Sequence, residues 1–132
     1  MYDSDEKITT LLVKLNKLTS LGKISWTVEP PPRSIIRGTD NHVPIYMSAI
    51  YKGRVFGLFL QRYQSFDGDH ERLYWSEQVV LAILDGEQNL LWEYATNSSA
   101  LYDLFETARR KVAGVDGIID DLINDDEYDD EL

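Results

Sequence analysis

The feature that most constrains the fold is a run of alternating apolar residues, from position 43 to 94, which three turn signals divide into four segments. The first turn, Tyr51-Lys52-Gly53-Arg54, has two central residues and a glycine where a tight hairpin needs a positive φ. The second connection covers residues 65–72 and the third covers residues 86–89. Alternation broken by turns at this spacing predicts an antiparallel meander.

Pairing the strands about these turns assigns one face of the sheet to the core. A slip of one residue would turn every side chain to the opposite face, so agreement of the three hairpins on one apolar face supports the assignment. The expected pairs are Ala49–Phe56, Met47–Leu58, Ile45–Leu60 and Val43–Arg62, then Leu58–Val79, Phe56–Leu81, Leu60–Glu77 and Arg62–Trp75, and finally Ile83–Trp92 and Leu81–Tyr94.

The reverse face of this sheet is more apolar than a face in water normally is. A second layer or a second subunit is therefore expected to cover it. The candidate interface residues on this face are Tyr46, Ile50, Val55, Phe59 and Val80.

Helical patterns flank the strands on both sides. Apolar residues at steps of three and four predict a helix over 5–20, and Gly22 ends it. Alternation from Ile24 to Val28 predicts a strand, which three prolines (30–32) confine to an edge or end, and a loop follows to residue 41. After an N-cap within 97–99, a long C-terminal helix is expected. Gly114 and Gly117 mark a bend, a break or a close backbone approach in it.

Together these elements predict an α+β fold: an N-terminal helix, a four- to five-stranded antiparallel meander sheet, a long C-terminal helix and an acidic disordered tail. We expect one domain over residues 1–123 and the tail over 124–132. The formal net charge is −10, and residues 113–132 hold nine acids and no base. Such a tail repels phosphate and membrane surfaces, so no direct nucleic-acid or membrane partner is expected.

Two stretches of the chain carry a resemblance. GKISW (22–26) and LYDLFETARRKVAGVDGIIDDL (101–122) resemble sequences in a set of small uncharacterised bacterial proteins with a helix–sheet–helix plan. The resemblance implies that plan and a bacterial or mobile-element origin. It implies no activity.

The residues that support catalysis are scarce. With no cysteine, thiolate metal sites and cysteine nucleophiles are excluded, and a reducing compartment, the cytoplasm, is favoured. His42 and His70 fall in predicted loops without partners at ligand spacing. The segment 67–72 lacks the glycine and glutamate positions of a calcium loop. We therefore expect no enzyme, no metal and no cofactor.

One constellation of charged and aromatic residues stands out near the open end of the sheet. On the predicted core face, Arg62 lies beside Trp75 and diagonal to Glu77. The first interpretation is a structural Arg62–Glu77 pair against the indole. The second is a pocket for an anionic, nucleotide-type small molecule, in which Arg62 binds the anion and Trp75 stacks on it. The residues of this candidate site are Arg62, Trp75, Glu77, Tyr63, Tyr74 and Arg72.

Three functional hypotheses follow. The first is a non-catalytic module that binds a protein partner and forms a homo-oligomer through the outer sheet face or the C-terminal helix stripe. The second is a binder that sequesters an anionic small molecule. The third is a protein inhibitor whose acidic tail occupies a basic partner surface.

Overall fold

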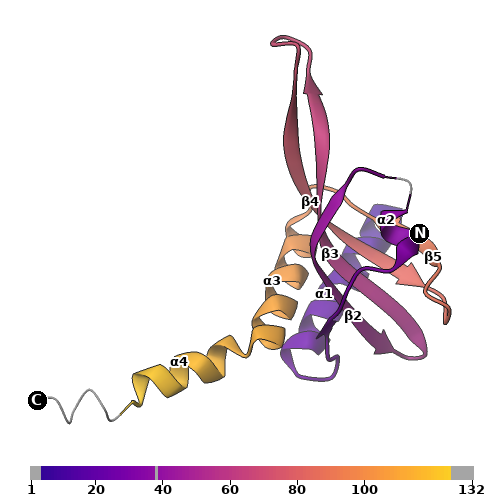
Figure 1. Ribbon diagram of the computed structural model, residues 1–132. Helices are drawn as coiled ribbons and strands as arrows, with labels where there is room; N and C mark the ends of the chain where they lie inside the picture. Colours follow the sequence, from indigo (N-terminus) through magenta and orange to yellow (C-terminus); the bar gives the residue numbers. More distant parts are fainter. Residues whose placement is uncertain (1–3, 38, 126–132) are drawn as a thin grey trace, which may run out of the picture.

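The computed structural model describes residues 4–37 and 39–125, and it has the α+β fold that the sequence predicts. Five strands form one antiparallel sheet in the order β1-β2-β3-β4-β5, so the sheet is a complete meander. Helices α1 and α3 cover one face and the short α2 lies on the other (Figure 1). The elements are α1 (Ser4–Ser20), β1 (Thr27–Val28), α2 (Arg33–Ile36), β2 (His42–Tyr51), β3 (Arg54–Asp67), β4 (Arg72–Leu84), β5 (Leu90–Tyr94), α3 (Ser99–Ala113) and α4 (Val115–Ile123).

The main core lies between the sheet and the pair α1–α3. The inward face of the strands carries Met47, Leu58 and Val79, all buried, and Ile83 packs against the same cluster. The predicted assignment of faces is therefore confirmed. Of the predicted first strand only Thr27–Val28 is extended and paired, while Ile24 and Trp26 are buried in this core.

The predicted registers are confirmed about the first and third turns, apart from one pair at the start of β2, and corrected about the second. The first turn has Lys52 at φ 50° and Gly53 at φ 74°, and Met47 pairs with Leu58. In the second hairpin Leu58 pairs with Leu81, not Val79. All pairs of this hairpin are shifted by two residues, which keeps each side chain on its predicted face.

The physical reason for the shift lies at the tip of this hairpin. The strands continue to Asp67 and Arg72, so the connection has four residues instead of eight. The Asp67 carboxylate accepts hydrogen bonds from the backbone N–H groups of Asp69 and His70, and its other oxygen lies 2.8 Å from His70 Nδ1. An aspartate that folds the chain back onto its own side chain makes a turn this tight possible.

A second correction concerns the start of β2. The predicted pair Val43–Arg62 is wrong, because His42 stands opposite Arg62 and the ladder is irregular between His42 and Ile45. Pro44 lies within that irregularity and has no N–H to donate to the ladder.

The outer face of the sheet is covered by the chain itself. Ile35 of α2 packs in a second cluster with Tyr46, Phe59 and Val80, whose exposed fractions are 2%, 0% and 1%. These three candidate interface residues are therefore core residues of the single chain and present no surface to a partner. Of the candidate set, Val55 is half-buried and Ile50 is exposed. Of the two alternatives expected to cover this face, a second layer or a second subunit, the structure contains the second layer, which α2 forms.

The expected long C-terminal helix is divided in two. Ser98 caps α3 by accepting a hydrogen bond from the Leu101 N–H, and Gly114 ends it in the left-handed conformation at φ 62°. The chain then resumes as α4, which leads away from the body (Figure 1). The break is thus the correct one of the three alternatives at Gly114. The expected disordered tail falls mostly on residues 126–132, outside the described residues.

None of the helices within residues 4–37 and 39–125 is long and apolar enough to span a membrane.

Candidate functional site

The candidate site residues lie on a projection of the sheet. Beyond the body, β3 and β4 continue as a two-stranded ribbon, here called the arm, formed by residues 62–77 (Figure 1). An isolated pair of strands is only marginally stable in water. Three large apolar side chains of the arm are exposed to solvent: Phe66, Leu73 and Trp75. The register of β3 and β4 places all three on the same face of the arm.

At the root of the arm, Arg62 and Glu77 form an ion pair. They are direct partners across β3 and β4, and Arg62 Nε donates to Glu77 Oε1 at 2.6 Å. Both side chains are about half exposed, at 50% and 49%, so the pair is not the buried one expected from the sequence. A half-exposed pair contributes about 1 kcal/mol or less to stability.

An open hollow of about 540 Å³, here called the arm hollow, is lined by His42, Arg62, Trp75 and Glu77. The His42 and Trp75 rings lie 5.2 Å apart between centroids and are tilted by 49°. His42 was expected to be a loop residue. It reaches the hollow because the irregularity at Pro44 places it opposite Arg62. The proline near the start of the strand was the one feature of the sequence that could have indicated this irregular pairing.

The other three candidate residues lie elsewhere. Tyr63 pairs with Ser76 and Tyr74 with Ser65, positions that alternate with Arg62 and so point to the opposite face of the ribbon. Arg72 pairs with Asp67 at the tip. Asp67 is five residues along β3 from Arg62, so Arg72 lies about 16 Å from Arg62 at 3.3 Å per residue. Only Arg62, Trp75 and Glu77 of the predicted set therefore come together.

The arm hollow has limited capacity for chemistry. Glu77 already neutralises the Arg62 guanidinium, so an anion entering the hollow must compete with a carboxylate at 2.6 Å. Within the described part of the chain, no group of three or more His, Cys, Asp or Glu side chains could bind a metal ion.

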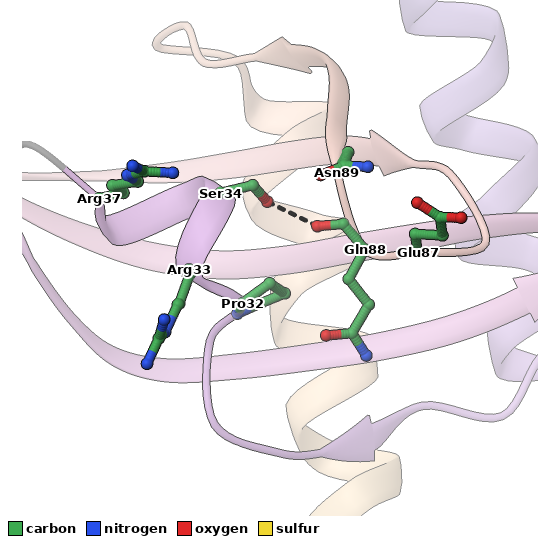
Figure 2. A pocket seen from close by; sticks show the side chains of 7 residues that line it. All are labelled: Pro32, Arg33, Ser34, Arg37, Glu87, Gln88 and Asn89. Carbon is green, nitrogen blue, oxygen red and sulfur yellow. Dashed lines mark hydrogen bonds between the residues drawn. The ribbon is translucent and has the colours of Figure 1, made fainter.

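A second hollow lies beside α2 and the turn between β4 and β5. Figure 2 shows its lining, in which the Ser34 hydroxyl donates to the Gln88 carbonyl at 2.7 Å and so fixes α2 to that turn. The turn itself is organised by Asp85, whose carboxylate accepts from the Glu87 and Asn89 N–H groups. Hydrogen bonds from Asn89 hold the pKa of Asp85 below its ordinary value.

The outer side of α2 combines one apolar residue with two cations. Arg33, Ile36 and Arg37 line a further open hollow of about 450 Å³, and Ile36 is partly exposed. Neither guanidinium forms an ion pair with a carboxylate of the described residues. Figure 2 shows both guanidinium groups well apart from Glu87, the one acid among the side chains drawn there. We call these three residues the α2 patch.

The third surface is the apolar stripe of α4. None of the nine residues of this helix is buried, and four large apolar side chains are exposed by 41–74%. We call these residues the α4 stripe: Ile118, Ile119, Leu122 and Ile123. An apolar stripe on the C-terminal helix was expected from the sequence. Because one continuous helix was predicted, the sequence analysis did not separate the part that packs on the body, α3, from the part that leaves it, α4.

Comparison of the chain with protein-family models, with curated proteins and with solved structures found no match. The bacterial resemblance of residues 22–26 and 101–122 therefore stays a prediction.

Proposed function

We propose that the protein is a non-catalytic interaction module that self-associates and binds another protein. The observation that carries this proposal is the α4 stripe, which the left-handed Gly114 directs away from the core. Helices shorter than about 12 residues are marginal in water without packing. A nine-residue helix with four exposed aliphatic side chains gains that packing when a protein surface covers the stripe.

The test compares α4 with a similarly exposed apolar pair in and just after α1. The double variant Ile119→Asp with Leu122→Asp replaces two of the four stripe residues with charges and leaves the core untouched. The control, Val13→Asp with Leu21→Asp, adds the same charges to exposed positions in and just after α1. In sedimentation velocity the α4 variant is expected to be monomeric, while the control keeps the mass of the unmodified protein. Equal behaviour of both variants would contradict the role of α4.

A second candidate function rests on the arm hollow. Arg62, His42 and Trp75 converge there, and this combination suits an anionic ligand that also stacks on an aromatic ring. Because Glu77 competes for Arg62, the Glu77→Gln variant should bind such a ligand more tightly than the unmodified protein. A titration with a nucleotide panel, followed by tryptophan fluorescence and repeated on Trp75→Phe, tests this. No response of Glu77→Gln at millimolar ligand would exclude the candidate.

A further inference from the structure

We propose that α4 packs against the α4 of a second copy, stripe against stripe, with the two helices antiparallel. The inference deepens the proposed self-association and rests on it, because it names the receiving surface and the direction of the helices. It is carried by the order of three features along the chain: a basic end of the body, the α4 stripe and an acidic segment.

The stripe and the acids of α4 occupy different faces of the helix. At about 100° per residue, Ile119 and Leu122 lie nearest the centre of the α4 stripe, and Asp120 and Asp121 each lie about 130° from that centre. A contact along the stripe therefore leaves both carboxylates in water. A second α4 stripe suits such a contact, since it presents only aliphatic side chains at its centre.

The end of the body from which α4 leaves is basic. Figure 1 shows α1 and α3 ending side by side there. The last turn of α1 carries Lys17, and the Lys23 N–H donates to the Leu18 carbonyl, which holds Lys23 at the same end. We call five exposed cations the basic end: Lys17, Lys23, Arg109, Arg110 and Lys111. The two arginines have acidic partners at 3.3 and 2.8 Å, whereas no ion pair with a described acid engages the three lysines.

The other end of α4 leads into the acidic segment, residues 125–132, which holds six acids and no base. The nine residues of α4 span about 13 Å at 1.5 Å per residue. In an antiparallel pair with level stripes, the acidic segment of each copy therefore begins near the start of α4 in the other copy, beside its basic end. A parallel pair would place acid beside acid and base beside base. The order of charges thus selects the antiparallel pair.

The exposed apolar face of the arm is the rival receiver for the α4 stripe. Residues 62–77 hold four acids and two arginines, so the arm repels the acidic segment that follows α4. The antiparallel α4 contact has no such penalty. It uses the same surface on both copies, so two copies close it as a dimer.

Neutralising the acidic segment tests the direction of the helices. A variant with Asn for each Asp and Gln for each Glu in residues 125–131 keeps the length of the chain. In the antiparallel pair it loses the attraction to the basic end, so its Kd in sedimentation should rise at least tenfold, and salt should weaken the unmodified dimer. Asp69→Asn with Glu71→Gln, at exposed positions of the arm tip, is the control and should stay within about twofold.

A double-mutant cycle tests the contact between the acidic segment and the basic end. Arg109→Glu with Lys111→Glu should weaken association at least tenfold in the unmodified chain. In the neutralised chain the same reversal should change Kd by less than about threefold, because its partner charges are gone. Lys52→Glu with Arg54→Glu is the control, since both are exposed in the β2–β3 turn, which Figure 1 shows on the side of the body away from α4.

Cross-linking tests the contact between the stripes. The chain has no cysteine, so Ile119→Cys supplies a single thiol. Near the centre of the stripe, it should form a disulfide-linked dimer under mild oxidation. Val13→Cys is the control, because Val13 is more exposed, at 58% against 41%, and should remain a thiol.

The outcomes distinguish the inference from the function on which it rests. If the neutralised variant associates as tightly as the unmodified protein or more tightly, or if Ile119→Cys forms no disulfide in a protein that still dimerises, the antiparallel pair is wrong and self-association stands. If the unmodified protein is monomeric at about 100 µM, where contacts with a Kd in the tens of micromolar are well populated, both fail.

Discussion

The ring of Tyr46 lies directly over the backbone of Gly57 on the neighbouring strand. A Cβ atom at position 57 would stand 2.6 Å from Tyr46 Oη and 2.9 Å from its Cε2, closer than real Cβ contacts. Tyr46 is 2% exposed and its ring packs against Phe59 at 5.7 Å between centroids. The glycine therefore creates the space that lets a tyrosine fill the layer between the sheet and α2.

Gly57→Ala is expected to destabilise the fold by about 1–3 kcal/mol, the usual cost of overpacking a filled core. Urea unfolding measures the effect. Gly86→Ala is the matched control, since nothing lies within 4 Å of its added methyl group, and it should change stability by less than about 0.5 kcal/mol. Equal midpoints for the two variants would mean that Tyr46 does not occupy the space above Gly57.

Tyr46 also predicts a loss of stability in alkali. Burial, with a smaller contribution from Glu29, raises the pKa of Tyr46 from 10.0 to about 12. A group whose pKa is raised on folding contributes its full stability below the unfolded value and loses it as pH rises through the folded value. The free energy of unfolding should fall by about 2 kcal/mol between pH 10 and pH 12 from this group. Tyr46→Phe is the reference, and identical pH profiles for both proteins would contradict the prediction.

The buried hydroxyl of Thr19 links α1 to Trp26, the residue just before β1. It accepts from Trp26 Nε1 at 3.0 Å and donates to the Leu15 carbonyl at 2.7 Å. Thr19→Val leaves the indole N–H unpaired and should cost about 1–3 kcal/mol in thermal or urea unfolding. Thr10→Val is the control, because Thr10 donates to the Glu6 carbonyl in the same way at an exposed position. A Thr19 effect no larger than the Thr10 effect would show that the indole bond is not needed.

The two glycines at the start of α4 should respond in opposite directions. Gly117→Ala meets no atom within 4 Å and raises helix propensity by about 1 kcal/mol, so α4 should exchange its amides more slowly and self-association should tighten up to about fivefold. Gly114→Ala strains a residue at φ 62°, at a cost of about 1–2 kcal/mol. Hydrogen exchange of residues 115–123 reports both effects. Faster exchange in Gly117→Ala would contradict the account.

The pattern of side chains was sufficient to predict the sheet but not the length of its strands. Alternation fixes which face Met47, Leu58 and Val79 share, and a two-residue register shift leaves that pattern unchanged. The shift depended on the carboxylate of Asp67 tightening the turn, a local hydrogen bond that periodicity does not detect. The same limit applies to Arg62, whose true partner Glu77 was predicted only as a diagonal neighbour.

The sequence predicted that the outer face is covered, but it could not decide what covers it, for a different reason. Three prolines suggested the end of a strand and a loop, yet the chain turns after Pro32 into α2 and places Ile35 over Phe59 and Val80. A four-residue helix has too few residues for a periodic signal. The exposed apolar surface is therefore the stripe on α4 and not the outer sheet face. The sequence analysis had given the C-terminal helix stripe as the alternative interface.

The central claim is that the protein self-associates, and its most direct test is the sedimentation mass of the unmodified chain over a dilution series from about 100 µM downward. The account predicts a mass above the 15.2 kDa of the single chain at the highest concentrations, falling toward it on dilution and at high salt. A mass of 15.2 kDa at every concentration would contradict it.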